Sequence, residues 1–265
     1  MDNNPKQTTK AEYDTAGDLN SSVKPLPGTA KTMMPQDIIP IHWFGNRKAY
    51  EKSAVRVVTI GLNPSDKEFR EDDNMPFSTK LRFPLYQMGK PETLELALDD
   101  YFKANPYNKW FKNFECVLNG MGASYYDRKE YPYRALHTDI CSPWATVPTW
   151  SKLSSKEQDA LYAEGHKQWL SLIAELKPDV MIASVAKRYP DELGVIDTQK
   201  EFCKFDLTKD GKKRRRPETV WKYEFNGIPF INGRTRNNPF GSLSDEYKQC
   251  VGEQIKQKLL RRGAV

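Results

Sequence analysis

The sequence predicts an α/β protein, a three-layer α/β/α arrangement around a central, mostly parallel sheet of four strands. Short apolar runs rich in β-branched residues alternate along the chain with longer segments of helical periodicity, which is the pattern of a parallel sheet with helices on both faces. Such runs suit strands that are buried on both sides. The four runs that predict core strands are 55–61, 134–140, 179–184 and 228–232.

Composition limits the class of protein. The chain has 265 residues, which is enough for one large domain, and its formal net charge of +6 favours an anionic partner. Residues 1–35 are polar and predict a disordered leader, and 36–265 predict a single domain. The sequence has no apolar run of about 18 residues and no apolar signal-peptide core near its start, so we expect a cytoplasmic protein that does not enter a membrane. We also expect a monomer.

Cysteine and histidine residues are scattered without metal-binding spacing. No C-x-x-C, H-x-x-x-H or H-E-x-x-H pattern occurs, so we expect neither a metal site nor another cofactor. The cysteines are expected to be reduced thiols. The cysteines are Cys116, Cys141, Cys203 and Cys250, and the histidines are His42, His137 and His166.

Helical signals lie between the four runs. After a charged loop over 66–73, apolar residues at helical spacing predict one helix over 93–104 and a short one over 110–118. The capping box 154–157 begins a long helix that continues to Leu176.

The second half of the chain contains the least regular segment. A helix is expected to start within 185–189, and Ser244 is expected to cap the last helix. Residues 191–220 lack clear periodicity and predict an irregular insertion, which carries the basic run 212–216. Residues 220–225 alternate like an exposed strand.

Polar residues follow three of the four predicted core strands. Asn63 lies in the turn after the first strand, Asp139 at the end of the second and Asn232 at the end of the fourth. Open α/β folds bind ligands at the carboxyl edge of the sheet, so these side chains are expected to converge there. Taken alone, the turn at Asn63 is equally typical of an ordinary connection from a strand to a helix.

Three segments together resemble the uracil-DNA glycosylase superfamily, over roughly 38–260. Gly61-Leu62-Asn63-Pro64-Ser65 resembles the water-activating motif in its G-x-N-P form, as in the mismatch-specific thymine/uracil branch. Pro76-Phe77 followed by Arg82-Phe83 is similar to the stretch that supplies an aromatic wall for the flipped base. Residues 232–237 sit where the family has a loop that inserts into the duplex, and 136–150 fits the second strand with its base-reading position.

The resemblance implies a monofunctional DNA glycosylase, which hydrolyses an N-glycosidic bond and leaves an abasic site. Two positions depart from the family: Asn232 stands where many members carry His, and Asp139 where many uracil readers carry Asn. The iron–sulfur cysteines of some branches are absent from the sequence. Members serve repair, and some bacterial relatives are thought to remove modified phage cytosines, so both settings stay open.

The first motif supplies the expected catalytic groups. Asn63 would orient a water molecule by accepting its hydrogen bond, since a carboxamide does not titrate near neutral pH. Asp66 is a candidate auxiliary base, with a solvated loop carboxylate as the alternative. Leu62 is assigned to the base-binding set, and Ser65 could hold a phosphate. Phe77 would stack on the extruded base or else be an ordinary core residue.

Asp139 determines the expected substrate. An ionised carboxylate would repel O4 of uracil or thymine but would accept a hydrogen bond from N4 of cytosine, so a cytosine-derived base is favoured. The alternative is an Asp that caps the turn around Ser142. Asn232 would donate to O2 of the departing base.

Basic residues predict contacts with the DNA backbone. Arg234 and Arg236 would probe the groove or pair with phosphates, and Arg214 and Arg215 belong to a basic run suited to phosphate binding, with a partnerless solvated loop as the alternative. Lys187 is a further candidate.

Two other functions stay open. The chain could be a non-catalytic reader of modified or single-stranded DNA with a glycosylase-like fold. It could also be a nucleotide- or sugar-processing enzyme, although the sequence has no Gly-rich phosphate loop to support this.

Overall fold

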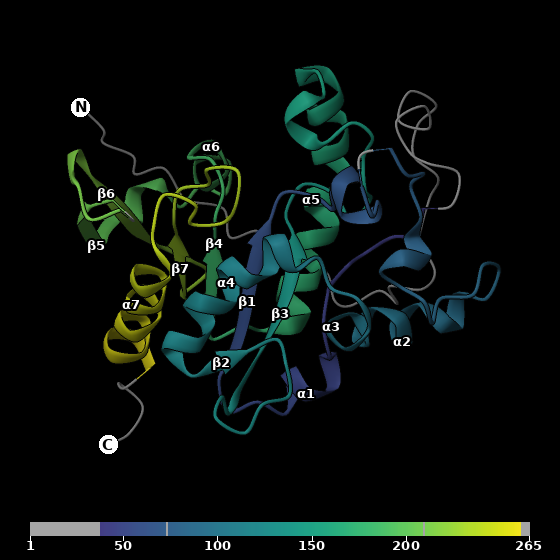
Figure 1. Ribbon diagram of the computed structural model, residues 1–265, viewed down its shortest axis with the longest axis horizontal. Coiled ribbons are helices and arrows are strands. Elements are labelled where there is room, and N and C mark those ends of the chain that lie inside the picture. The colour runs from purple at the N-terminus through teal and green to yellow at the C-terminus, as the bar shows by residue number, and fades with distance from the viewer. Residues whose placement is uncertain (1–37, 73, 209, 261–265) are drawn as a thin grey trace, which may run out of the picture.

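The computed structural model describes residues 38–72, 74–208 and 210–260, so the leader expected over 1–35 lies outside the described residues. The protein is an α/β protein with a single mixed sheet flanked by helices (Figure 1). The sheet has seven strands in the order β2-β3-β1-β4-β7-β6-β5. Their bounds are β1 Arg56–Gly61, β2 Ala123–Ser124, β3 Tyr133–Asp139, β4 Val180–Ala183, β5 Lys200–Leu207, β6 Lys213–Phe225 and β7 Ile228–Asn232.

The four predicted core strands are all present, but the expectation of a four-stranded sheet is wrong. Strands β3, β1, β4 and β7 lie side by side and parallel. Strand β2 adds a parallel neighbour at one edge, and β6 and β5 add antiparallel strands at the other. The short β2 and the charged β5–β6 pair lack the apolar runs that reveal a buried strand, so only their pairing partners make them strands.

The sequence predicted an irregular segment over 191–220, and this prediction is wrong. Most of it forms β5 and the first half of β6, a hairpin that continues the sheet beyond β7. The strand predicted over 220–225 is confirmed as the second half of β6, but it is not an exposed strand, because Val220, Tyr223 and Phe225 are buried. Both strands have long exposed stretches, so their sequences lack the alternation of apolar and polar residues that is typical of a half-buried strand.

The helix-capping residues predicted from the sequence are confirmed. Ser154 and Glu157 form the predicted capping box of α5, and Ser244 caps α7. The helix expected over 93–104 is interrupted at Asp100, which divides it into α2 and α3. The helices are α1 Arg47–Glu51, α2 Leu94–Asp99, α3 Tyr101–Ala104, α4 Asn108–Met121, α5 Ser155–Leu176, α6 Arg188–Glu192 and α7 Asp245–Ile255.

Helices α4 and α5 cover opposite faces of the sheet. The ring of His137 in β3 contacts Phe111 and Phe114 of α4. The next residue, Thr138, accepts a hydrogen bond from the indole of Trp169 in α5 at 3.1 Å. Successive strand residues point to opposite faces, so the two helices enclose β3 from both sides. None of the helices in the described part of the chain is long and apolar enough to cross a membrane.

The register of the parallel strands aligns their carboxyl ends. Gly61 of β1 is opposite Asp139 of β3, and Ala183 of β4 is opposite Asn232 of β7. The loops that follow β1 and β3 therefore leave the sheet at the same level, which is where a candidate site is found.

Candidate functional site

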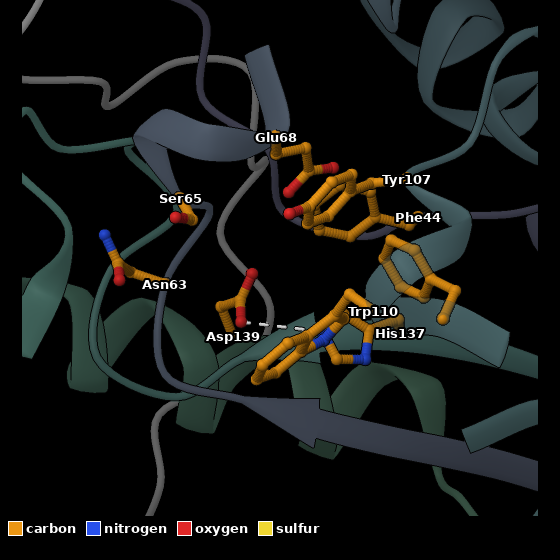
Figure 2. Close-up of a pocket in the computed structure, with 9 residues that line it drawn as sticks. Phe44, Asn63, Ser65, Glu68, Tyr107, Trp110, His137 and Asp139 are labelled. Carbon is orange, nitrogen blue, oxygen red and sulfur yellow. Dashed lines mark ion pairs between the residues drawn. The ribbon is translucent and has the colours of Figure 1, made fainter. Parts of the chain in front are cut away.

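A pocket that is partly open to solvent lies at the carboxyl ends of β1 and β3 (Figure 2), and the empty space between its walls, open solvent included, is about 320 Å³. Its walls come from the segment before α1, the loop after β1, the start of α4 and the end of β3. The lining residues are Phe44, Asn63, Ser65, Glu68, Tyr107, Trp110, Phe111, His137 and Asp139.

Asp139 reaches this pocket beside His137. Its carboxylate Oδ1 lies 3.5 Å from Nε2 of His137, and both side chains are almost fully buried. Nδ1 of His137 lies 2.8 Å from the hydroxyl of Thr59, which also contacts the hydroxyl of Tyr125. His137 is thus held in the core, and it also forms part of the pocket wall.

Gly61 is required by this arrangement. A Cβ atom at residue 61 would lie 2.4 Å from Oδ1 of Asp139 and 3.0 Å from Nε2 of His137. Because real Cβ atoms do not approach so closely, the glycine of the motif makes room for the Asp139 carboxylate.

The geometry favours the pocket over the capping alternative for Asp139. The turn after β3 is capped by Ser142, whose hydroxyl accepts a hydrogen bond from the amide of Trp144 at 3.0 Å. Across the described residues, no hydrogen bond joins the Asp139 carboxylate to this turn. Figure 2 shows the carboxylate at the pocket wall, with His137 as its marked partner.

Asn63 has a defined orientation at the pocket. Its amide nitrogen donates to the hydroxyl of Thr146 at 3.0 Å and, at 3.5 Å, to the carbonyl of Trp144. Because a carbonyl can only accept, these contacts identify the nitrogen, and Oδ1 is left as an acceptor. This is the group that could orient a water molecule.

Glu68 is a pocket residue that the sequence analysis missed. It lies in the 3-10 helix Asp66–Phe69, is 5% exposed, and accepts a hydrogen bond from the Tyr101 hydroxyl at 2.5 Å. The pKa of Glu68 is raised to about 8, chiefly by burial and also by the negative charge of Asp139, while the Tyr101 hydrogen bond and the charge of Arg82 oppose the shift. The S-x-x-E spacing of Ser65 and Glu68 was the available signal, because it is typical of a helix start rather than of a solvated loop.

Asp66 is not in the pocket, which corrects the expected auxiliary base. Its carboxylate accepts a hydrogen bond from Nε of Arg70 at 2.6 Å, within the charged loop. The loop does supply a carboxyl group to the site, but that group belongs to Glu68.

The aromatic wall is also not the expected one. Phe77 packs on Phe69 with ring centroids 5.0 Å apart, and it does not line the pocket. The wall consists of Phe44, Tyr107, Trp110 and Phe111. Their distance along the chain from the motif explains why local resemblance could not find them.

Leu62 does not reach the base-binding position assigned to it. Its half-buried side chain packs against the core and lies outside the pocket lining. Its carbonyl accepts a hydrogen bond from the amide of Cys141 at 2.8 Å, which ties the loop after β1 to the loop after β3.

Asn232 does not converge with Asn63 and Asp139. Its Oδ1 accepts from the amide of Val185 at 3.1 Å, and its Nδ2 donates to the carbonyl of Val185 at 3.2 Å. This buried pair joins the end of β7 to the loop after β4. Asn232 also lies outside the pocket lining, so the structure does not bring its carboxamide to a base held in that pocket.

The predicted DNA-binding residues differ in whether their side chains are bound within the protein or exposed. Arg214 is bound to the carbonyls of Leu207 and Ser242, so its guanidinium serves the fold rather than a phosphate. Arg215 is exposed in β6, and Arg234 and Arg236 are exposed in the loop after β7.

Two further residues complete the predicted set. Lys187 is exposed and paired with Asp191 at 3.3 Å. Ser65 lines the pocket and caps the 3-10 helix that carries Glu68.

The pocket combines flat aromatic walls with two hydrogen-bond acceptors and one group that can donate. Asp139 can accept, Asn63 can accept through Oδ1, and a protonated Glu68 can donate. This set suits a flat heteroaromatic ring that carries an amino group beside an acceptor atom. No protein-family model matches the chain, and comparisons with curated proteins and with solved structures found no match either.

Proposed function

We propose that this protein is a monofunctional DNA glycosylase similar to the uracil-DNA glycosylase superfamily, acting on a cytosine-derived base. One observation carries the proposal: Asn63 and Asp139, at the ends of neighbouring strands, line one aromatic-walled pocket. The enclosure of β3 between α4 and α5 supports the three-layer α/β/α arrangement that such a fold implies.

In this function the target nucleotide leaves the duplex and its base enters the pocket. Phe44 and Trp110 belong to the wall against which the base would lie, as base-flipping enzymes require. Asp139 accepts a hydrogen bond from the N4 amino group, whereas O4 of uracil would be repelled. Base identity is therefore read at the end of β3.

Asn63 contributes positioning. With its nitrogen held by Thr146, Oδ1 accepts a hydrogen bond from a water molecule placed beneath C1′. The water then adds to the sugar cation as the base departs, which leaves an abasic site. The exposed Arg215, Arg234 and Arg236 hold the DNA backbone, and the protein acts as a monomer in repair or in defence against phage DNA.

A panel of oligonucleotides tests this function directly. Duplexes that carry uracil, a thymine mismatch, cytosine or a modified cytosine are incubated with the protein, and abasic sites are detected by alkaline cleavage. Release of a cytosine-derived base by the wild type and its loss in Asn63→Ala are expected. Binding without base release that Asn63→Ala does not affect would instead identify a non-catalytic reader.

Asp139→Asn tests base reading. The amide can donate to O4, so the preference should move towards uracil. Asp179→Asn is the matched control, because Asp179 accepts from the amide of Arg56 far from the pocket, at the opposite end of the sheet. A loss of stability in Asp139→Asn without a change in preference would contradict direct reading.

A further inference from the structure

Two carboxyl groups face the same pocket from different segments. Glu68 comes from the loop after β1, and Asp139 comes from the end of β3 (Figure 2). Figure 2 shows them on opposite sides of the opening, with Asn63 and Ser65 to one side and the aromatic wall to the other. A ligand in the pocket would therefore meet both groups.

Hydrogen bonding fixes the direction of the Tyr101 proton. The amide of Tyr107 donates to the Tyr101 hydroxyl at 3.0 Å, so this oxygen already acts as an acceptor. Its own proton points to Oε1 of Glu68 at 2.5 Å. When Glu68 is protonated, its proton is consequently carried on Oε2.

The environment of Glu68 favours the protonated state of its carboxyl group. The pKa of Glu68 is raised to about 8, chiefly by burial and in part by the charge of Asp139. At neutral pH Glu68 is therefore mostly a neutral acid that can donate. A buried carboxyl group that stays neutral near pH 7 can act as a general acid.

From this geometry we infer that Glu68 is the general acid of the reaction, donating its Oε2 proton to N3 or O2 of the departing base. The inference rests on the proposed function and fills the role that Asn232, bound to Val185, does not. It also fits the edge of cytosine, on which the N4 amino group donates while N3 and O2 accept. Asp139 and Glu68 together match this edge.

The step balances without any added reactant. The C1′–N1 bond breaks and its electron pair stays with the base, which takes the proton from Glu68. The oxygen of the water held by Asn63 bonds to C1′ and releases one proton. That proton returns to the Glu68 carboxylate through the solvent in the open pocket, so the enzyme ends in its starting state.

The test measures single-turnover base release between pH 5 and 10 with the substrate identified by the oligonucleotide panel. Wild type should lose rate above about pH 8, as Glu68 ionises. Glu68→Gln keeps a donor in the pocket and an acceptor for Tyr101 but cannot transfer a proton. Its rate should fall roughly 10²- to 10⁴-fold, the usual contribution of general acid catalysis, and the alkaline loss should disappear.

Two further variants separate proton transfer from effects on the fold. Glu115 is another buried glutamate with a raised pKa caused by burial, but it accepts from Ser124 and the amide of Tyr125 outside the pocket. Glu115→Gln should leave the pH profile unchanged. Tyr101→Phe removes a hydrogen bond that lowers the pKa of Glu68, so the alkaline loss should move to higher pH.

A substrate series completes the test. A 5-fluoro substituent withdraws electrons and makes the base a better leaving group, so Glu68→Gln should lose less rate on 5-fluorocytosine than on cytosine. If Glu68→Gln keeps the wild-type rate and alkaline loss, the inference is overturned while the glycosylase function stands. If wild type releases no base from any oligonucleotide, the proposed function fails, and this inference fails with it.

Discussion

The carboxylate of Asp139 lies 3.5 Å from Nε2 of His137, and both groups occupy space that a side chain at residue 61 would need. Gly61 and Asp139 are partners in register across two parallel strands. The glycine of the first motif and the carboxylate of the second strand therefore depend on each other.

Gly61→Ala should disrupt the pocket. The new Cβ would lie 2.4 Å from Oδ1 of Asp139, so the carboxylate must move. Overpacking of this kind costs about 1–3 kcal/mol, which urea unfolding would measure. Base release should fall as well. The double variant Gly61→Ala/Asp139→Ala should regain stability but not activity, and failure to regain stability would show that the clash lies elsewhere.

Thr146→Val should slow base release through Asn63. The hydroxyl of Thr146 accepts from Nδ2 of Asn63 at 3.0 Å, and valine has the same shape without that acceptor. A misplaced positioning group can cost up to about 10²-fold in rate. DNA affinity should not change. Thr146→Ser keeps the hydroxyl and serves as the control; an equal loss in both variants would argue against a role of Asn63 in catalysis.

Asn232→Ala should act on stability alone. Two hydrogen bonds to the backbone of Val185 are lost, and both backbone groups are left buried. A cost of roughly 1–3 kcal/mol per unsatisfied group is expected in chemical denaturation. The rate of base release per folded molecule should stay close to wild type, and a large fall in that rate would return Asn232 to the site.

Arg214 and Arg215 should differ although they are neighbours. Arg214→Ala removes contacts to the carbonyls of Leu207 and Ser242 and should lower the melting temperature. Arg215 is exposed, so Arg215→Ala should keep the melting temperature but weaken DNA binding. The slope of log K against log salt should fall by about 1 for each lost phosphate contact. Equal effects of both variants on binding would contradict this assignment.

Glu68 should make the protein less stable as pH rises. Its pKa is about 8 in the folded protein against an ordinary value of 4.5, so between these values folding takes up a proton that the unfolded chain lacks. Its stabilising contribution is complete below pH 4.5 and is lost as pH rises towards 8. The slope for one proton is about 1.4 kcal/mol per pH unit. Urea unfolding of wild type and Glu68→Gln should show this difference in slope, and parallel curves would refute it.

Local sequence predicted the elements whose signals lie within a few residues. The apolar runs of β1, β3, β4 and β7 and the capping box at Ser154 are of this kind. The charged β5–β6 hairpin was missed because its strands are stabilised by pairing with each other and with β7. An exposed strand carries little hydrophobic signal of its own.

By itself, the sequence determined that Asn63 and Asp139 stand at strand ends, because a buried strand and its turn are both encoded locally. Only the tertiary structure decided that Glu68 joins them, since its partner Tyr101 is 33 residues away. The same holds for Asn232, whose partner Val185 is 47 residues away. Whether a polar side chain faces a pocket or a backbone depends on what packs against it, and strand and turn patterns do not contain that information.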